Sequence, residues 1–377
     1  MILLRRSVAI LLYVGCLAFE ARLASAQPAL PKVIKAEPPA EWNALFTGGE
    51  GWIGGDGVYS TTLNRERVLF LFGDTLIGKV KNGRRAGAAM VNNTIGVMDR
   101  NSVPAPVQFA FSKSDNDEPA AMFRPADGHG WFWPQAAVEI DGRLFVFLAQ
   151  IEKTSDEGVF GFRQVGQWLA TIERPLEDPQ NWHAEQRPIP FVEFKKGRER
   201  VWGSALFVGD DYVYIYGIED RERKLGSKQL IVARAPLAKL AEFDRWEFRG
   251  DDGWSTTAAA ESLAAGLANE FSVSRLADGN YVLIYTESGL SDRILARVAA
   301  SPDGPWSAPR LVYTCPETAA DKGLFCYSAK EHPWASQGNT LLISYCVNAW
   351  KFGRLFEDEA VYRPKFVKVT FGAASQR

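Results

Sequence analysis

The chain repeats one arrangement of apolar and polar positions: an apolar strand, a short polar turn, and a second apolar strand that ends beside polar groups. Asp-Gly, Gly-Asp-Asp and Gly-Asn turns between these strands indicate β-hairpins. The two ends of an antiparallel hairpin lie together, so Asp56 is expected beside Asp74, and Glu270 beside Glu287. The five copies are Gly55–Asp74, Gln135–Gln150, Gly203–Glu219, Glu270–Glu287 and His332–Asn348.

A second repeat follows the central hairpins. A further strand pair and then a tryptophan come after three of them, at Trp182, Trp246 and Trp306, which supports four strands per unit. Repeats of this kind are typical of propellers, so we predict an all-β fold: a five-bladed β-propeller with four-stranded antiparallel blades. A sandwich with irregular hairpins is the structural alternative. Thr256–Ala268 has a helical composition, and we expect one short helical insertion there.

The first residues have the pattern of a signal peptide. Arg5 and Arg6 precede an apolar run and a small-residue cleavage site that ends at Ala26. We therefore expect a secreted or periplasmic protein with residues 1–26 removed. A lipoprotein signal at Cys16 is the less favoured alternative.

The remainder is interpreted as one domain. Residues 27–41 contain several prolines and alanines and are predicted to form a linker, which leaves 42–377 for the propeller. No stretch after the signal reaches the ~18 consecutive apolar residues of a membrane span. The 43 Lys and Arg residues nearly balance the 45 Asp and Glu residues, and no basic stripe appears. Nucleic acid is therefore not an expected partner. We also expect a monomer.

The cysteines allow one disulfide in an oxidising compartment. We prefer the pair Cys315–Cys326, since both residues flank one loop, whereas Cys346 lies inside an apolar strand. Cys326–Cys346 is the alternative. The three have no spacing typical of a thiolate metal site.

Three carboxylates are the candidate catalytic residues. Asp56 opens the first hairpin between two glycines, Asp74 closes it, and Glu270 opens the fourth hairpin beside Phe271. Two carboxyl groups facing each other across a channel are what glycosidic-bond cleavage needs, one to protonate the leaving oxygen and one to activate water or attack carbon. Each also has a structural interpretation: a turn residue, a strand end and an exposed helix end. Glu287 is the fallback acid.

Other residues near the predicted channel mouth are candidates for substrate binding. His332 opens the fifth hairpin, where it would bind a sugar hydroxyl, orient a carboxylate or hold water on a cation; a core histidine is the alternative. Tryptophan rings near strand starts could stack on sugar faces or simply pack between sheets. The complete set is Trp133, Gln135, Trp202, Glu287, Lys330, His332, Asn348 and Arg363.

The sequence from Trp52 to Val369 resembles a group of uncharacterised secreted bacterial proteins. The shared signatures are GGDGVYS…LFGDTLIG, NEFSV…YVLIYTE, ARVAASPDGPWS and AKEHPWA…YCVN…YRPKFVKV. This group is similar to a domain-of-unknown-function family that contains endo-D-arabinanases. It resembles, more remotely, the five-bladed propeller glycosidases of the arabinanase/β-xylosidase and invertase/levansucrase type.

The resemblance implies roles for individual residues. Asp56 matches the first-blade aspartate, which acts as base or nucleophile, and Glu270 is the best match for the acid. The aspartate that tunes the site has no direct counterpart, because the second and third hairpins begin at Gln135 and Ser204. Asp74 would take that role. A channel histidine beside a cation in the arabinanase-like family resembles His332, so a calcium ion in the channel is compatible with the resemblance, although no cofactor is required.

The leading hypothesis is a secreted glycoside hydrolase that acts on a furanose-containing or related polysaccharide. One alternative is a carbohydrate-binding propeller without catalysis, which the missing third acid would favour. The other is a cell-envelope module whose channel mouth docks another protein.

Overall fold

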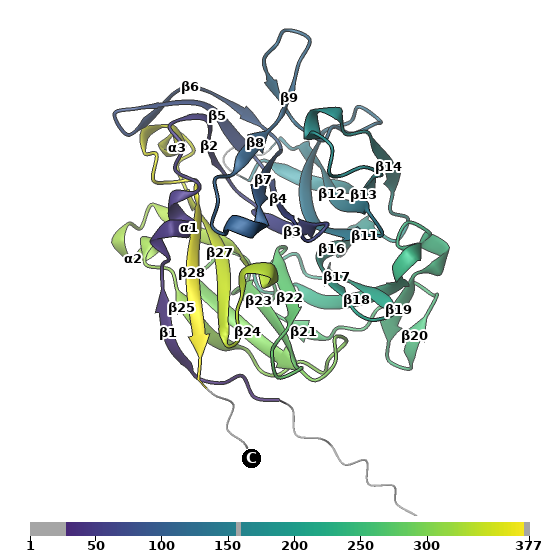
Figure 1. Cartoon of the computed structure of the whole chain (residues 1–377). Helices are drawn as coiled ribbons and strands as arrows, with labels where there is room; N and C mark the ends of the chain where they lie inside the picture. The colour runs from purple at the N-terminus through teal and green to yellow at the C-terminus, as the bar shows by residue number, and fades with distance from the viewer. Residues whose placement is uncertain (1–27, 156–159, 373–377) are drawn as a thin grey trace, which may run out of the picture.

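The computed structural model describes residues 28–155 and 160–372, and within these ranges the protein is all-β. The predicted signal peptide, residues 1–26, lies outside the described part. Five sheets contain four or more strands and follow one another around the molecule (Figure 1). The described α-helices are short: α1 (Ala40–Ala44), α2 (Glu317–Ala320) and α3 (Arg354–Glu357).

The first and second sheets each contain four antiparallel strands, paired in chain order. Residues 131–140 of the second sheet lie between the first and third sheets: Phe132 packs in a cluster with first-sheet residues, and Val138 packs in a cluster with third-sheet residues. The strands are β3 (Tyr59–Leu63), β4 (Arg67–Phe72), β7 (Thr94–Asp99) and β8 (Gln108–Ala110) in the first sheet, and β11 (Trp131–Ile140), β12 (Arg143–Lys153), β13 (Phe162–Ile172) and β14 (Ala184–Pro188) in the second.

The third sheet is larger, with seven strands, and the fourth again has four. Short strands at its edges extend the third sheet. Its members are β15 (Glu193–Lys195), β16 (Arg198–Val208), β17 (Tyr212–Asp220), β18 (Gln229–Pro236), β19 (Glu247–Gly250), β20 (Gly253–Ser255) and β21 (Ala264–Ala265). The fourth sheet contains β22 (Phe271–Arg275), β23 (Tyr281–Thr286), β24 (Arg293–Ala299) and β25 (Arg310–Thr314).

The fifth sheet joins both ends of the described chain. Its order is β26 (Leu324–Glu331), β27 (Thr340–Ala349), β28 (Pro364–Phe371) and then β1 (Val33–Glu37) from the N-terminal region. Residues 33–37, inside the segment predicted to be a linker, therefore form an edge strand. Four of the five β1 side chains are exposed, so the strand is held by backbone pairing and carries no apolar alternation that the sequence could reveal.

Smaller elements complete the structure. A three-stranded sheet contains β2 (Glu50–Gly55), β5 (Thr75–Lys81) and β6 (Arg84–Val91), of which β5 and β6 lie between β4 and β7 in the chain. In addition, β9 (Ser112–Lys113) pairs with β10 (Pro119–Ala120). The 3₁₀ turns are Arg100–Ser102, Pro179–Asn181, Leu237–Lys239, Phe243–Arg245 and Pro333–Ala335.

The first strands of the first, second and fourth sheets, the second strand of the third, and β26 of the fifth converge on one cavity of about 270 Å³. Side chains from β3, β11, β16, β22 and β26 all line it. The apolar core lies around this cavity, in clusters between successive sheets. One such cluster packs Phe147 and Trp202 against Phe248, and another packs Ile284 against Val347. Apolar packing between the sheets therefore fixes how the strands surround the cavity.

The predicted helical insertion at Thr256–Ala268 is wrong. The described backbone there is irregular apart from β21, which pairs with β18. The Gly266 and Leu267 N–H groups donate to the Lys228 carbonyl, and the Leu267 side chain is fully buried. Pairing with a neighbouring sheet edge and burial of Leu267 override the helical propensity of the alanines.

The predicted disulfide is also absent. Cys315, Cys326 and Cys346 are all buried free thiols. Cys315 and Cys326 do lie together, and a hydrogen bond between their thiols, together with burial, raises the pKa of Cys315 above its ordinary value.

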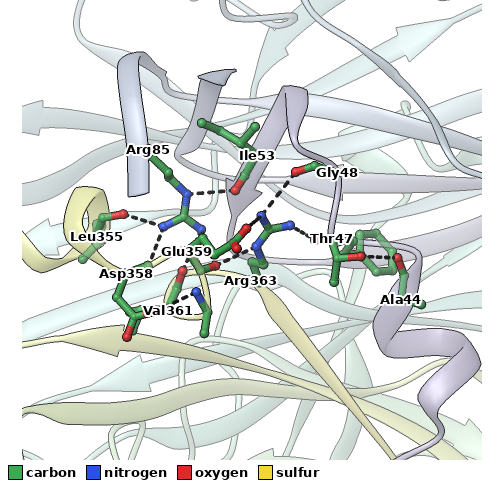
Figure 2. A network of polar contacts seen from close by, with 12 residues as sticks. Ala44, Thr47, Gly48, Ile53, Arg85, Leu355, Asp358, Glu359, Val361 and Arg363 are labelled. Atoms are coloured by element: carbon green, nitrogen blue, oxygen red, sulfur yellow. Dashed lines mark hydrogen bonds and ion pairs between the residues drawn. The ribbon is translucent and has the colours of Figure 1, made fainter. Parts of the chain in front are cut away.

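Two buried arginines, Arg85 and Arg363, hold the loop after α3 against the sheet of β2, β5 and β6 (Figure 2). We call this pair the arginine clamp. Both residues are only 4% exposed, and their guanidinium groups bond mainly to backbone carbonyls. Arg85 on β6 bonds to the carbonyls of Ile53, Leu355, Asp358, Glu359 and Val361; Arg363 bonds to those of Phe46, Gly48 and Glu359 and to the Glu359 carboxylate. A guanidinium has five donors in a fixed plane, so each side chain can tie several strands and turns together.

Replacement of Arg85 is expected to destabilise the protein. Arg85→Met would leave several buried carbonyls without donors, and we expect a loss of about 3 kcal/mol in the free energy of unfolding. Urea unfolding measures the loss. The neighbouring Arg84 is exposed, so Arg84→Met is the matched control and should leave the midpoint nearly unchanged. Equal midpoints for the two variants would contradict this role of Arg85.

Candidate active site

Asp56 and Asp74 are held side by side by the backbone. Asp56 lies between β2 and β3, and Asp74 between β4 and β5. The Asp56 N–H donates to the Asp74 carbonyl at 3.3 Å, and the Gly73 N–H donates to the Asp56 carbonyl at 3.0 Å. Gly57 has φ +85°, a conformation that glycine adopts without strain, and this allows the chain to turn into β3. The ends of the first hairpin thus meet, as its pattern predicts.

Each carboxylate has its own hydrogen-bond donors. The Tyr327 hydroxyl donates to Asp56 Oδ2 at 2.6 Å. Trp133 Nε1 donates to Asp74 Oδ1 at 2.8 Å, and Asn92 Nδ2 donates to the same oxygen at 3.2 Å. Donors that come from β26, from β11 and from the turn after β6 fix both carboxyl groups in orientation.

Both carboxyl groups bind protons more tightly than an exposed aspartate does. Desolvation and the adjacent Asp74 charge raise the pKa of Asp56 to about 7, against the opposing effect of the Tyr327 hydrogen bond. Desolvation raises the pKa of Asp74 to about 6, although Trp133 and Asn92 stabilise its charge. Two neighbouring carboxyls titrate as a pair, so near neutral pH the pair still retains a proton in a large share of molecules.

Glu270 and Lys330 complete the charged cluster. Glu270 directly precedes β22, and its charge contributes to the raised pKa of Asp56. Lys330 on β26 is 2% exposed; its ammonium lies 4.3 Å from the centre of the Tyr59 ring and donates to Ser328. Burial lowers the pKa of Lys330, and the charges of Glu270 and Asp56 oppose that shift. Asp56, Glu270 and Lys330 therefore interact electrostatically from three different sheets.

The acids lie at one end of the central cavity. Val58 and Tyr59, which follow Asp56, line the cavity, as does Phe271, which follows Glu270. Lys330 is in its wall. The cavity itself is lined mainly by apolar and small side chains, and Lys330 and Glu331 are the ionisable residues in its lining.

Two further predicted residues lie on β11 of the second sheet. Trp133 is half-buried and bonds to Asp74, and its ring contacts Trp131 and Phe162. Gln135 is buried and accepts a hydrogen bond of 2.6 Å from Gln167. Gln135 therefore belongs to an amide network inside the second sheet, which also reaches the backbone of the third sheet.

His332 is a satisfied buried histidine. Its Nδ1 is 2.6 Å from Ser60 Oγ, and its Nε2 is 2.8 Å from Ser344 Oγ. Burial, together with the Lys330 charge, lowers the pKa of His332 to about 3, so the ring is neutral at physiological pH. Both ring nitrogens are occupied by protein hydroxyls, which favours the structural interpretation of this residue over a ligand contact.

Four predicted substrate-binding residues lie in other surroundings. Trp202 is fully buried between sheets and donates to the Phe191 carbonyl at 3.1 Å, so its ring has no face open to a sugar. Arg363 belongs to the arginine clamp, where its guanidinium group bonds to backbone carbonyls and to the Glu359 carboxylate. Asn348 bonds to the backbone N–H of Ala349, and Glu287 forms an ion pair with Arg293 at 3.2 Å. Each of the four is occupied by contacts within the protein.

Sequence reasoning missed the tyrosines of the site. Besides Tyr327, Tyr362 approaches the acids: its hydroxyl donates to the Asp74 carbonyl at 3.0 Å, and its own carbonyl accepts the Gly55 N–H. Their sequence surroundings resemble those of packing aromatics. The one available signal was their position beside the shared signatures: Tyr362 begins YRPKFVKV, and Tyr327 lies two residues before AKEHPWA.

Within residues 28–155 and 160–372, no helix has the length and apolar character required to cross a membrane. In the same ranges, no group of three or more His, Cys, Asp or Glu side chains is arranged to hold a metal ion.

The class of protein follows from this geometry: an all-β protein with a cluster of carboxyl groups at one end of a central cavity. The chain belongs to the DUF5005 family, a domain of unknown function, whose profile matches residues 39–371. Its fold is similar to a Bacteroides ovatus protein to which a hydrolase activity has been ascribed, with a TM-score of 0.69, 20% identity and coverage of 89% and 90% of the two chains. It also resembles the GH43_1 enzyme of Xanthomonas citri complexed with xylotriose, with a TM-score of 0.50, 15% identity and coverage of 90% and 91%.

A partial sequence relative comes from a fungus. The notoamide biosynthesis cluster protein J of an Aspergillus strain is 28% identical over 138 residues. This match covers 35% of the present chain and 35% of the fungal protein, so the similarity extends over about a third of that relative.

Gly73 is expected to be essential for the placement of Asp56. A Cβ atom on Gly73 would lie 2.6 Å from Asp56 Oδ1 and 3.7 Å from Trp133, so Gly73→Ala must displace the carboxylate. We expect a fall in kcat/KM of about 100-fold on any substrate that the protein turns over. A Cβ on the exposed Gly49 meets no atom within 4 Å, so Gly49→Ala is the matched control. Wild-type activity in both variants would contradict the close approach.

Proposed function

We propose that the protein is a glycoside hydrolase, and that its five larger sheets are the blades of a five-bladed propeller around the cavity. The observation that carries the proposal is the cluster of Asp56, Asp74 and Glu270 at one end of that cavity, in which the pKa values of both aspartates are raised. Perturbed carboxyl groups at a concave site are typical of acid–base catalysis. The similarity in fold to a GH43_1 enzyme agrees with the proposal.

The roles follow from the positions. Glu270 protonates the departing glycosidic oxygen, and Asp56 in its ionised form activates water or attacks the anomeric carbon. Asp74 raises the pKa of Asp56 and bonds through its carboxylate to Trp133, so it acts on Asp56 rather than on the sugar. Tyr327 holds Asp56 in a single orientation. Lys330 balances part of the negative charge that the cluster carries.

The substrate class is a furanose-containing or related polysaccharide, and the protein acts as a secreted or periplasmic monomer. The signal-like pattern of residues 1–26 supports secretion, and the xylotriose complex of the Xanthomonas citri enzyme supports an oligosaccharide ligand. The carboxylate mechanism requires no cofactor. A calcium ion in the channel stays a prediction.

A binding protein without catalysis is the alternative with an observation in its favour. The second and third sheets present Gln135 and Ser204 where an additional acid would be expected, and both side chains are buried. Asp74, just after β4 of the first sheet, is then the aspartate that accompanies Asp56 through a direct backbone contact.

Digestion of arabinan, xylan and fructan with product analysis separates these two functions. For the enzyme, we expect soluble products from at least one glycan and a loss of at least about 1,000-fold in kcat for Asp56→Asn and Glu270→Gln, because each removes a proton-transfer or nucleophilic group. Asp117 is exposed and pairs only with Lys113 among the described residues, so Asp117→Asn is the matched control. Binding without products after long incubation would support the alternative, and full turnover by Asp56→Asn would exclude its assigned role.

The pH dependence of kcat/KM tests the role of Asp56. Because the base must be ionised and its pKa is about 7, activity is expected to rise as the pH rises through 7. Asp74→Asn removes the neighbouring charge that raises this pKa, so the rising limb should move to lower pH by roughly one unit. Asp117→Asn should leave the limb in place. A wild-type rate that falls above pH 7 would instead make Asp56 the proton donor.

A further inference from the structure

A continuous row of aromatic rings begins at Asp56. Tyr327 donates to Asp56. The next ring in the row is that of Phe325, which precedes Tyr327 by two residues on β26, and the two ring centres are 5.6 Å apart. Trp350, directly after β27, lies 4.5 Å from Phe325. The row therefore runs outward along the fifth sheet from one catalytic candidate.

The same row returns to Asp74 through the second sheet. Phe160 lies 6.0 Å from Phe325 and 6.2 Å from Trp350, and its ring contacts Phe162 at 6.5 Å. Phe162 lies 4.6 Å from Trp133, whose indole N–H donates to Asp74. Rings from two sheets thus connect one acid to the other.

The outer members of this row are open to solvent. Trp350 is 51% exposed and Phe160 is 47% exposed, whereas Phe325 beneath them is 6% exposed. Large aromatic rings that touch one another at the surface leave apolar area in water, and such contiguous patches mark binding sites more often than scattered single residues do. The ring contacts connect this patch to Tyr327 and Trp133, the hydrogen-bond donors of the two acids.

We propose that Trp350 and Phe160, with Phe325 beneath them, form a subsite for the sugar units attached to the one that is cleaved. This inference rests on the proposed function and identifies the substrate as an oligosaccharide or polysaccharide chain rather than a small glycoside. Flat, rigid rings bury the apolar C–H face of a sugar at little entropic cost, and they need no charged partner. The aromatic row would guide the chain toward Asp56 from one side and Asp74 from the other.

Binding can be tested without turnover. Migration in native gels that contain arabinan, xylan or fructan gives a dissociation constant for Asp56→Asn and for the same protein carrying Trp350→Ala or Phe352→Ala. Phe352 is 47% exposed and contacts Phe356, outside the row, so it is the matched control. We expect Trp350→Ala to weaken binding of the retarding glycan about tenfold, or 1.4 kcal/mol, and Phe352→Ala to change it less than twofold.

Chain-length dependence provides the second measurement. With the active protein and oligosaccharides of two to six units, Trp350→Ala should raise KM for the longer chains about tenfold and leave kcat and the KM of the disaccharide within about twofold. Retained gel binding that depends on Trp350, without turnover of any glycan, would support the subsite and reject the hydrolase.

Three outcomes would overturn the subsite. The first is normal turnover with unchanged KM in Trp350→Ala, which would leave the hydrolase intact. The second is an equal loss of binding in Phe352→Ala. The third is that the protein binds none of the three glycans. If Trp350→Ala then also abolishes self-association of the protein, the patch is assigned to a second copy of the chain.

Discussion

The site depends on one constraint: two carboxyl groups are held next to each other, away from bulk water, by backbone hydrogen bonds that join Asp56 to Asp74 and to Gly73. Asp56 and Asp74 cannot separate without breaking the bond from Asp56 N–H to the Asp74 carbonyl. Their enforced proximity raises the pKa of Asp56, since desolvation and like charge both disfavour its ionised form. A carboxyl group that would otherwise be ionised at neutral pH thereby acquires a proton equilibrium near pH 7.

The surrounding structure maintains this unfavourable arrangement. Gly73 leaves room for the Asp56 carboxylate, and the hydrogen bonds from Tyr327 and Trp133 reach the pair from the fifth and second sheets. The arginine clamp acts one step further away, because Arg85 and Arg363 fix the turn that leads to Tyr362 (Figure 2). Free energy from packing and hydrogen bonding elsewhere in the fold thus offsets the cost of crowding the acids, as is common at functional sites.

The sequence predicted much of the fold but less of the site. Period-two alternation and turn residues located the central hairpins, because these signals are local. Thr256–Ala268 was misjudged for the same reason: alanine has a local helical preference, whereas the burial of Leu267 and the pairing of β21 involve distant residues. Edge strand β1 was missed because exposed side chains carry no alternation. Among the candidate substrate-binding residues, Trp202 and Trp133 looked alike in sequence. Trp202 packs between sheets, whereas Trp133 bonds to Asp74.

The sequence by itself determined the all-β class, the hairpin pattern and the meeting of Asp56 with Asp74, since strand alternation and a single hairpin connect residues that are near in the chain. Only the tertiary structure decided which groups from other sheets reach that pair. Tyr327, 271 positions after Asp56, and Lys330 come from the fifth sheet, and Glu270 directly precedes the first strand of the fourth. Their proximity results from packing between sheets, and a linear pattern contains no record of which side chains that packing brings face to face.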